Sequence, residues 1–165
     1  MNIFVVDTDP EVAARSLCDK HIVKMPLETA QMLCAVSWRF LVPAPYKPSF
    51  QHHPCTRWAG ETLENWHWLL RHGLELCAEY ERRFWRRHAC LKVLLWCQEQ
   101  GGRPSPGPRA PFVQALPKEL RQEDAVMAYR AYYLRDKARF ARWTLPAEPP
   151  AWWSTSRCSG NSHGL

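Results

Sequence analysis

Residues 18–31 read CDKHIVKMPLETAQ, a stretch that sets charged side chains among apolar ones at helical spacing. Residues three and four apart share one face of a helix. Four polar side chains have that spacing: His21, Lys24, Glu28 and Gln31. The other side is apolar enough to face a core, and Pro26 predicts a kink or a new helix start. We expect this stretch to begin a helix that reaches about residue 40.

On both sides of this stretch the pattern is again mostly helical. Residues 2–6, NIFVV, are β-branched and aromatic and predict one short buried strand. Asp9 followed by Pro10 predicts a helix start, which gives a helix to about residue 18. Apolar residues at helical spacing predict three more helices. Their expected ranges are 56–77, 90–98 and 122–143.

Two Pro-rich segments, 41–55 and 103–117, predict long loops. The predicted fold class is therefore mainly α, a single compact helical domain with one short N-terminal β-strand and long Pro-rich loops. That domain is expected to cover residues 1–153. The polar segment 154–165 is expected to be a mobile C-terminal tail.

The composition limits the class of protein. The chain has 165 residues, of which 46% are hydrophobic, and this suits one folded domain. It has no apolar run long enough to span a membrane and no signal-peptide pattern, so we expect a cytoplasmic protein without a membrane partner. We also expect a monomer. Seven cysteines without CxxC spacing predict reduced thiols, and neither a metal nor a cofactor is expected.

The net charge of +6, with nine tryptophans and five tyrosines, is typical of a nucleic-acid-binding protein. Basic side chains hold phosphates and aromatic rings stack on bases, although most tryptophans are expected to fill the core. The last predicted helix carries the strongest basic stripe. We expect it to bind DNA through Arg130, Arg135, Lys137, Arg139 and Arg142.

Four segments carry a family resemblance: MNIFVVDTDP at 1–10, CDKHIVKM at 18–25, HPCTRW at 53–58 and PPAWW at 149–153. They resemble a family of small proteins encoded by tailed phages and some bacteria. Pro26 and His52 depart from it, since members have an aliphatic residue and Asn there. The family is similar to defence-associated DNA glycosylases that excise hypermodified bases, such as glucosylated hydroxymethylcytosine, from phage DNA. The resemblance implies excision of a modified base.

A glycosylase needs a carboxylate near the sugar, because positive charge develops there as the N-glycosidic bond breaks. Asp19 and Glu28 are the candidates, with Asp19 preferred, and His21 or His53 would orient water or protonate the departing base. Lys20 or Lys24 would hold a flanking phosphate, and either of them, in a dry pocket, would permit Schiff-base chemistry and strand cleavage. Six residues are candidates for substrate binding: Lys20, Gln31, Tyr46, Trp58, Asn65 and Trp66.

Other interpretations remain open at this point. Lys24 and Glu28 also fit an ordinary ion pair on a solvated helix face, and Asn65 fits a structural hydrogen-bonding role. The whole chain also fits a non-enzymatic nucleic-acid-binding accessory protein, or an enzyme acting on a free nucleotide or nucleoside sugar. Salt-sensitive binding to long DNA would separate the DNA-binding functions from the last of these.

Overall fold

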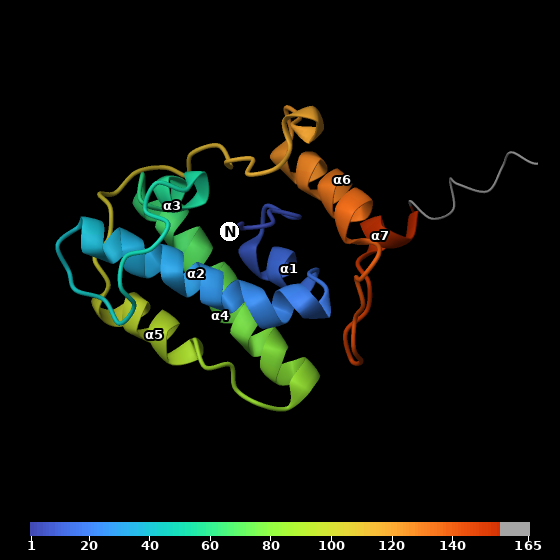
Figure 1. Ribbon diagram of the computed structural model, residues 1–165, viewed down its shortest axis with the longest axis horizontal. Helices are drawn as coiled ribbons and strands as arrows, with labels where there is room; N and C mark the ends of the chain where they lie inside the picture. The colour runs from blue at the N-terminus through green and yellow to red at the C-terminus, as the bar shows by residue number, and fades with distance from the viewer. Residues whose placement is uncertain (156–165) are drawn as a thin grey trace, which may run out of the picture.

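A computed structural model describes residues 1–155 of the chain. Its elements, in order, are α1 (Pro10–Arg15), α2 (Asp19–Arg39), α3 (Pro54–Ala59), α4 (Leu63–Phe84), α5 (Leu91–Gln100), the 3-10 helix η1 (Lys118–Leu120), α6 (Ala125–Lys137) and α7 (Ala151–Thr155). Figure 1 shows α2 and α4 at the centre, with the N-terminus lying between them and α6. The mainly α prediction is confirmed.

The long helices α2 and α4 form the centre of the core. Helix α2 runs through Pro26 without a break, so neither a new start nor an interruption occurs there. Helix α4 approaches it closely at Gly73, where an added Cβ would lie 2.5 Å from Cγ2 of Thr29. Only glycine permits that approach. The two helices thus hold Glu28, one residue from Thr29, in a rigid part of the molecule.

The strand predicted at residues 2–6 is wrong, since no strand occurs in the part of the chain that the structure describes. Oδ1 of Asn2 accepts the backbone N–H groups of Ile3 and Phe4, at 2.7 and 3.1 Å. Phe4 has φ 38°, and the N–H of Val6 donates to its carbonyl. Local side-chain bonds take the place of a neighbouring strand.

Several predicted helix limits also change. The helix expected from residue 56 is two helices, capped by His53 and by Thr62. The first helix ends at Arg15 instead of residue 18, and the last long helix at Lys137 instead of residue 143. From there the chain folds back, so that the N–H of Asp19 donates to the carbonyl of Arg142. Of the predicted tail, residues 154–165, the part from residue 156 onward lies outside the described residues.

A buried ion-pair network fixes the start of α2. Arg83, on α4, is fully buried and donates to Glu79, to Asp19 and to the carbonyls of Arg15 and Leu17. One guanidinium therefore joins α4 to the end of α1 and the beginning of α2. Six cysteines in the described residues are buried free thiols. No helix of residues 1–155 is both long and apolar enough to cross a membrane.

Candidate active site

Glu28 is the centre of a nearly enclosed polar cluster, and its side chain is only 10% exposed. Oε2 accepts the backbone N–H of Asn2 at 2.9 Å and lies 3.8 Å from the α-amino nitrogen of Met1. Oε1 lies 3.0 Å from Nζ of Lys24. A carboxylate beside an amine, with a second cation on its other oxygen, is an arrangement suited to acid–base chemistry.

The side chain of Asn2 fixes the N-terminal segment against the carboxylate. Its Nδ2 donates to the carbonyl of Ala115 at 2.8 Å, and its Oδ1 holds the turn that follows. Ala115 is held in turn by Tyr129, whose hydroxyl accepts the Ala115 N–H and donates to the carbonyl of Val113. Helix α6 and the long loop before it therefore position the first two residues beside Glu28.

The start of α3 forms another wall of the cluster. Oγ1 of Thr56 contacts Sδ of Met1 at 3.7 Å. Burial lowers the pKa of His53, and the positive charge of the amino terminus adds to that effect while Glu28 opposes it. Burial raises the pKa of the Cys55 thiol to about 12, so this cysteine is not a nucleophile at neutral pH. The structure thus brings His53 to the same site as Glu28 and Lys24.

Lys24 does not lie in a dry pocket. Its side chain is 67% exposed, and its contact with Glu28 is the i,i+4 ion pair that the sequence allowed. The condition for Schiff-base chemistry at this lysine is therefore absent. The amino group of Met1 is in a drier environment, since the side chain of that residue is only 2% exposed.

His21 belongs to an aromatic cluster next to this site. Its ring stacks on Phe4 at 4.4 Å, and its Nδ1 lies 2.7 Å from the hydroxyl of Tyr133. Burial, with Lys137 and then Lys24 nearby, lowers the pKa of His21 to about 3. The ring is therefore neutral at pH 7 and is a weak proton donor for a departing base. Lys20 lies over the neighbouring Phe140 ring, 4.7 Å from its centroid.

Asp19, the carboxylate that the sequence favoured, lies away from this site. It accepts hydrogen bonds from Arg83 and from both the N–H and the hydroxyl of Thr144. Nine residues separate it from Glu28, which places the two on opposite sides of α2 at about 100° per residue. Its observed contacts are those of a structural hydrogen-bond acceptor.

Several predicted substrate-binding residues lie in the core. Trp58 and Trp66 are buried, so neither offers a free face for a base. Asn65 is buried and joins the carbonyl of Trp58 to the N–H of Ala110. Tyr46 is half-buried with its hydroxyl 3.6 Å from Sγ of Cys90, and Gln31 is half-buried on α2.

The predicted basic stripe lies partly on α6 and partly on the segment after it, and it is partly neutralised. Arg130 donates to the carbonyl of Val6 and pairs with Asp7, and Arg135 pairs with Asp136 and Glu119. Lys137, Arg139 and Arg142 have no carboxylate within 4.0 Å among the described residues. Lys137 donates to the hydroxyl of Tyr132 at 3.2 Å and lies over that ring.

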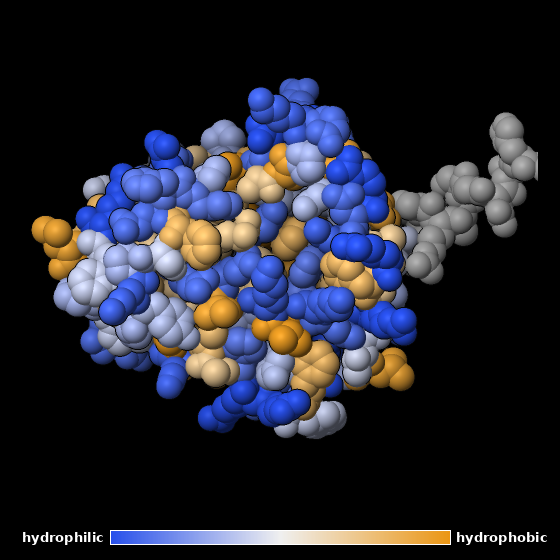
Figure 2. Space-filling view, viewed as in Figure 1, coloured by the Kyte–Doolittle hydropathy of each residue, from blue (hydrophilic) through white to orange (hydrophobic). Residues whose placement is uncertain are grey.

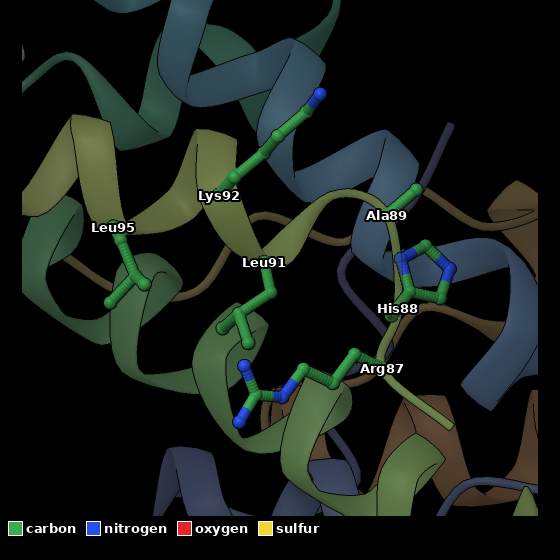
Figure 3. Close-up of a pocket in the computed structure, with 6 residues that line it drawn as sticks. All are labelled: Arg87, His88, Ala89, Leu91, Lys92 and Leu95. Carbon is green, nitrogen blue, oxygen red and sulfur yellow. The ribbon is translucent and has the colours of Figure 1, made fainter.

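A separate apolar hollow of about 360 Å³ lies beside α5 (Figure 3). Nε2 of His88 lies 3.0 Å from the Val23 carbonyl, which is about 140° around α2 from Glu28. Figure 3 shows Lys92 pointing away from Arg87 and Leu91. The hollow therefore presents no converging charged groups. Residues 1–155 contain no cluster of three His, Cys, Asp or Glu side chains able to hold a metal ion.

Sequence reasoning missed the contribution of Met1, Asn2 and Thr56. A backbone amine has no side-chain signature, and its distance to Glu28 depends on tertiary packing. One signal was present, since a polar Asn followed by four apolar residues at the very start of the sequence indicates a buried N-terminal segment.

Comparison with known proteins identifies the family of the chain. Residues 1–93, which include Met1, Glu28 and His53, match the family described as pyrimidine dimer DNA glycosylase. No curated protein and no solved structure gives a significant match. The match confirms the predicted class of enzyme, a DNA glycosylase, and DNA as its partner. The chain belongs to the pyrimidine dimer DNA glycosylase family.

Proposed function

We propose that this protein excises damaged pyrimidines from DNA, with the Met1 amine as nucleophile and Glu28 as the carboxylate that assists it. The observation that carries the proposal is the 3.8 Å separation of these two groups within a nearly enclosed cluster. The family description supports a pyrimidine dimer as the damaged base. Excision of a glucosylated cytosine remains the second candidate, because the sequence segments resemble glycosylases of that kind.

The reaction balances with these two groups and one water molecule. The amine nitrogen bonds to C1′ of the deoxyribose as the C1′–N bond to the base breaks, and the base leaves with a proton. Glu28 stabilises the positive charge that develops at C1′, accepts a proton from the attacking amine and passes it to the departing base. Opening of the sugar ring then gives an imine, which water hydrolyses to an abasic site. Loss of a C2′ proton with cleavage of the C3′–O bond would instead break the strand.

A hydrolytic route uses the same carboxylate differently. Glu28 would deprotonate a water that attacks C1′, and the amine of Met1 would contribute only charge. The covalent route is favoured because the Met1 amine lies 3.8 Å from the carboxylate and its residue is enclosed, whereas Lys24 is exposed.

Unpaired cations near this cluster support DNA binding. Lys20 lies over the Phe140 ring and Lys137 over the Phe4 ring, and both rings contact His21. Neither lysine has a carboxylate partner among the described residues. Figure 2 shows a face on which hydrophilic side chains predominate and apolar ones form separate spots. Such a surface suits phosphate contacts better than a large apolar protein partner.

The test is excision from three duplexes of one sequence: undamaged, with a single cyclobutane thymine dimer, or with glucosylated hydroxymethylcytosine. The two bases of a dimer are joined by carbon–carbon bonds, so breaking one glycosidic bond releases no free base. Alkali-labile sites must therefore be measured together with free base by mass spectrometry. We expect alkali-labile sites in the dimer duplex only. Free glucosylated base would favour the second candidate, and salt-sensitive binding without excision would indicate an accessory protein.

A further inference from the structure

A polar hollow of about 450 Å³ lies between the C-terminal half of α2 and α3. Exposed polar side chains surround its mouth: Arg39, Gln51, His52 and Arg57. Buried Thr56 contributes to its lining, together with apolar side chains of α2. No carboxylate lines the hollow among the described residues.

Neither of its two guanidinium groups has an acidic partner, although that of Arg39 lies over the Phe40 ring, 5.9 Å from the centroid. In residues 1–155, neither Arg39 nor Arg57 has a carboxylate within 4.0 Å or a side-chain hydrogen bond to a protein acceptor. An added Cβ at Gly60 would lie 3.2 Å from Nη1 of Arg39, so the missing side chain there leaves room for this guanidinium. Two forked cationic donors beside an amide and an imidazole form a site suited to a phosphate oxyanion.

The hollow lies next to the cluster around Glu28, and Thr56 joins the two. Thr56 lines the hollow and contacts Met1 through its hydroxyl. Ala35, also in the lining, is seven residues after Glu28 on α2, so the two share a face and lie about 10 Å apart along the axis. Phosphates of one DNA strand advance roughly 3.4 Å per nucleotide along the duplex. For a duplex whose axis runs along α2, this offset corresponds to about three nucleotides between the hollow and the reacting sugar.

We propose that this hollow binds one backbone phosphate of the damaged strand, about three nucleotides from the excised base, through Arg39 and Arg57. This assignment rests on the proposed DNA glycosylase function. The phosphate fixes the direction of the strand, so that the glycosidic carbon meets the Met1 amine. Contacts to phosphate carry no sequence information, so the site serves position and affinity.

The test removes the negative charge of single phosphates in the DNA and the positive charge of single arginines in the protein. Duplexes carry one neutral methylphosphonate linkage at each of five positions on either side of a thymine dimer, and the dissociation constant is measured at fixed salt for wild type, Arg57→Gln and Arg39→Gln. We expect one position, about three nucleotides from the lesion, to weaken wild-type binding roughly tenfold. At that position alone, Arg57→Gln and Arg39→Gln should lose most of the methylphosphonate effect. Arg71→Gln, which removes the same charge from a residue paired with Glu11, should keep it.

A second arm uses inorganic phosphate as the probe. Competition by inorganic phosphate that depends on Arg57, without any methylphosphonate effect, would show that the hollow takes a free phosphate and would overturn the proposal. Uniform weakening at all positions in both arginine variants would also overturn it. If the arginine variants lose the methylphosphonate effect at one position but no excision occurs, the phosphate site is supported and the proposed function is refuted. If excision occurs without that effect, only the phosphate site is refuted.

Discussion

The backbone N–H of Asn2 donates a 2.9 Å hydrogen bond to Oε2 of Glu28, which places the first residue of the chain beside a nearly enclosed carboxylate. Glu28→Gln keeps an oxygen acceptor for this bond but removes the negative charge. We expect excision to fall at least about a hundredfold, because charge stabilisation at C1′ is lost. DNA binding should stay close to wild type, and the free energy of unfolding should fall by about 1–3 kcal/mol because the ion pair with Lys24 is lost. A Glu28→Gln variant with normal excision would exclude this carboxylate.

The sequence offered two carboxylates, Asp19 and Glu28, as catalytic candidates. Asp19→Asn tests the first of them. The variant weakens charged hydrogen bonds to Arg83 and Thr144, so the free energy of unfolding should fall by about 1–3 kcal/mol. The rate of excision per folded molecule should change less than about threefold, since Asp19 is on the other side of α2. Urea unfolding and single-turnover excision measure the two effects. Loss of excision without loss of stability would indicate that Asp19 is a catalytic residue and would contradict a purely structural role.

Asn2→Ala tests the positioning of the amino terminus. The variant removes the 2.8 Å bond to the Ala115 carbonyl and the bonds that hold the turn at Phe4. We expect kcat to fall roughly 10–100-fold with a small change in KM, because a displaced nucleophile loses its alignment with C1′. Arg15→Ala, a surface substitution elsewhere, is the control. An unchanged kcat in Asn2→Ala would show that the backbone bond to Glu28 suffices.

Two buried histidines make stability depend on pH. Burial lowers the pKa of His72 to about 3, and neither of its ring nitrogens has a hydrogen-bond partner in the described residues. His21 also has a pKa lowered to about 3, chiefly by burial. The unfolded chain binds more protons between pH 6.5 and 3, so stability falls as the pH drops through that window. At pH 5 the loss is about 2 kcal/mol per histidine.

Urea unfolding between pH 8 and 4 measures this dependence. His72→Phe, which keeps an aromatic ring against Trp68, should show a shallower loss of stability than wild type. Equal slopes for the two proteins would contradict a neutral buried His72.

Arg83 is expected to be the most sensitive position outside the active site. Its removal leaves Glu79 and Asp19 without a buried cation and frees two backbone carbonyls. Arg83→Met should lower the free energy of unfolding by about 3–5 kcal/mol. Arg82→Met, beside it but half exposed, should cost about 1 kcal/mol or less. Equal losses in the two variants would argue against the network.

Local signals predicted much of the fold. Asp9 caps α1 through Glu11 and Val12, as its sequence context indicated, and α2 has the predicted range. The strand predicted at residues 2–6 was wrong because a strand needs a partner strand from elsewhere in the chain, which the local pattern cannot supply. The predicted end of the last long helix, at residue 143, was wrong because the chain folds back and the Arg142 carbonyl accepts the N–H of Asp19. That hydrogen bond is a tertiary contact, which local helical spacing does not reveal.

The candidate site was predictable to the same extent. The spacing of Lys24 and Glu28 on one helix indicated their ion pair, and His53 was named from its loop. The contact of Asp19 with Arg83 was not predictable, because the two residues are 64 apart in the sequence. Arg39 and Arg57 were passed over because an isolated arginine on a helix usually indicates solvated surface, and only folding brings the two to one hollow.

The most direct measurement is reduction with borohydride during the reaction, followed by mass spectrometry of the peptides. Wild-type protein, the thymine-dimer duplex and borohydride should give a stable protein–DNA adduct attached to the α-amino nitrogen of Met1, absent in Glu28→Gln. Mass analysis of the purified chain establishes that this amine is free. An adduct on Lys24, or efficient excision without any adduct, would contradict the Met1–Glu28 mechanism.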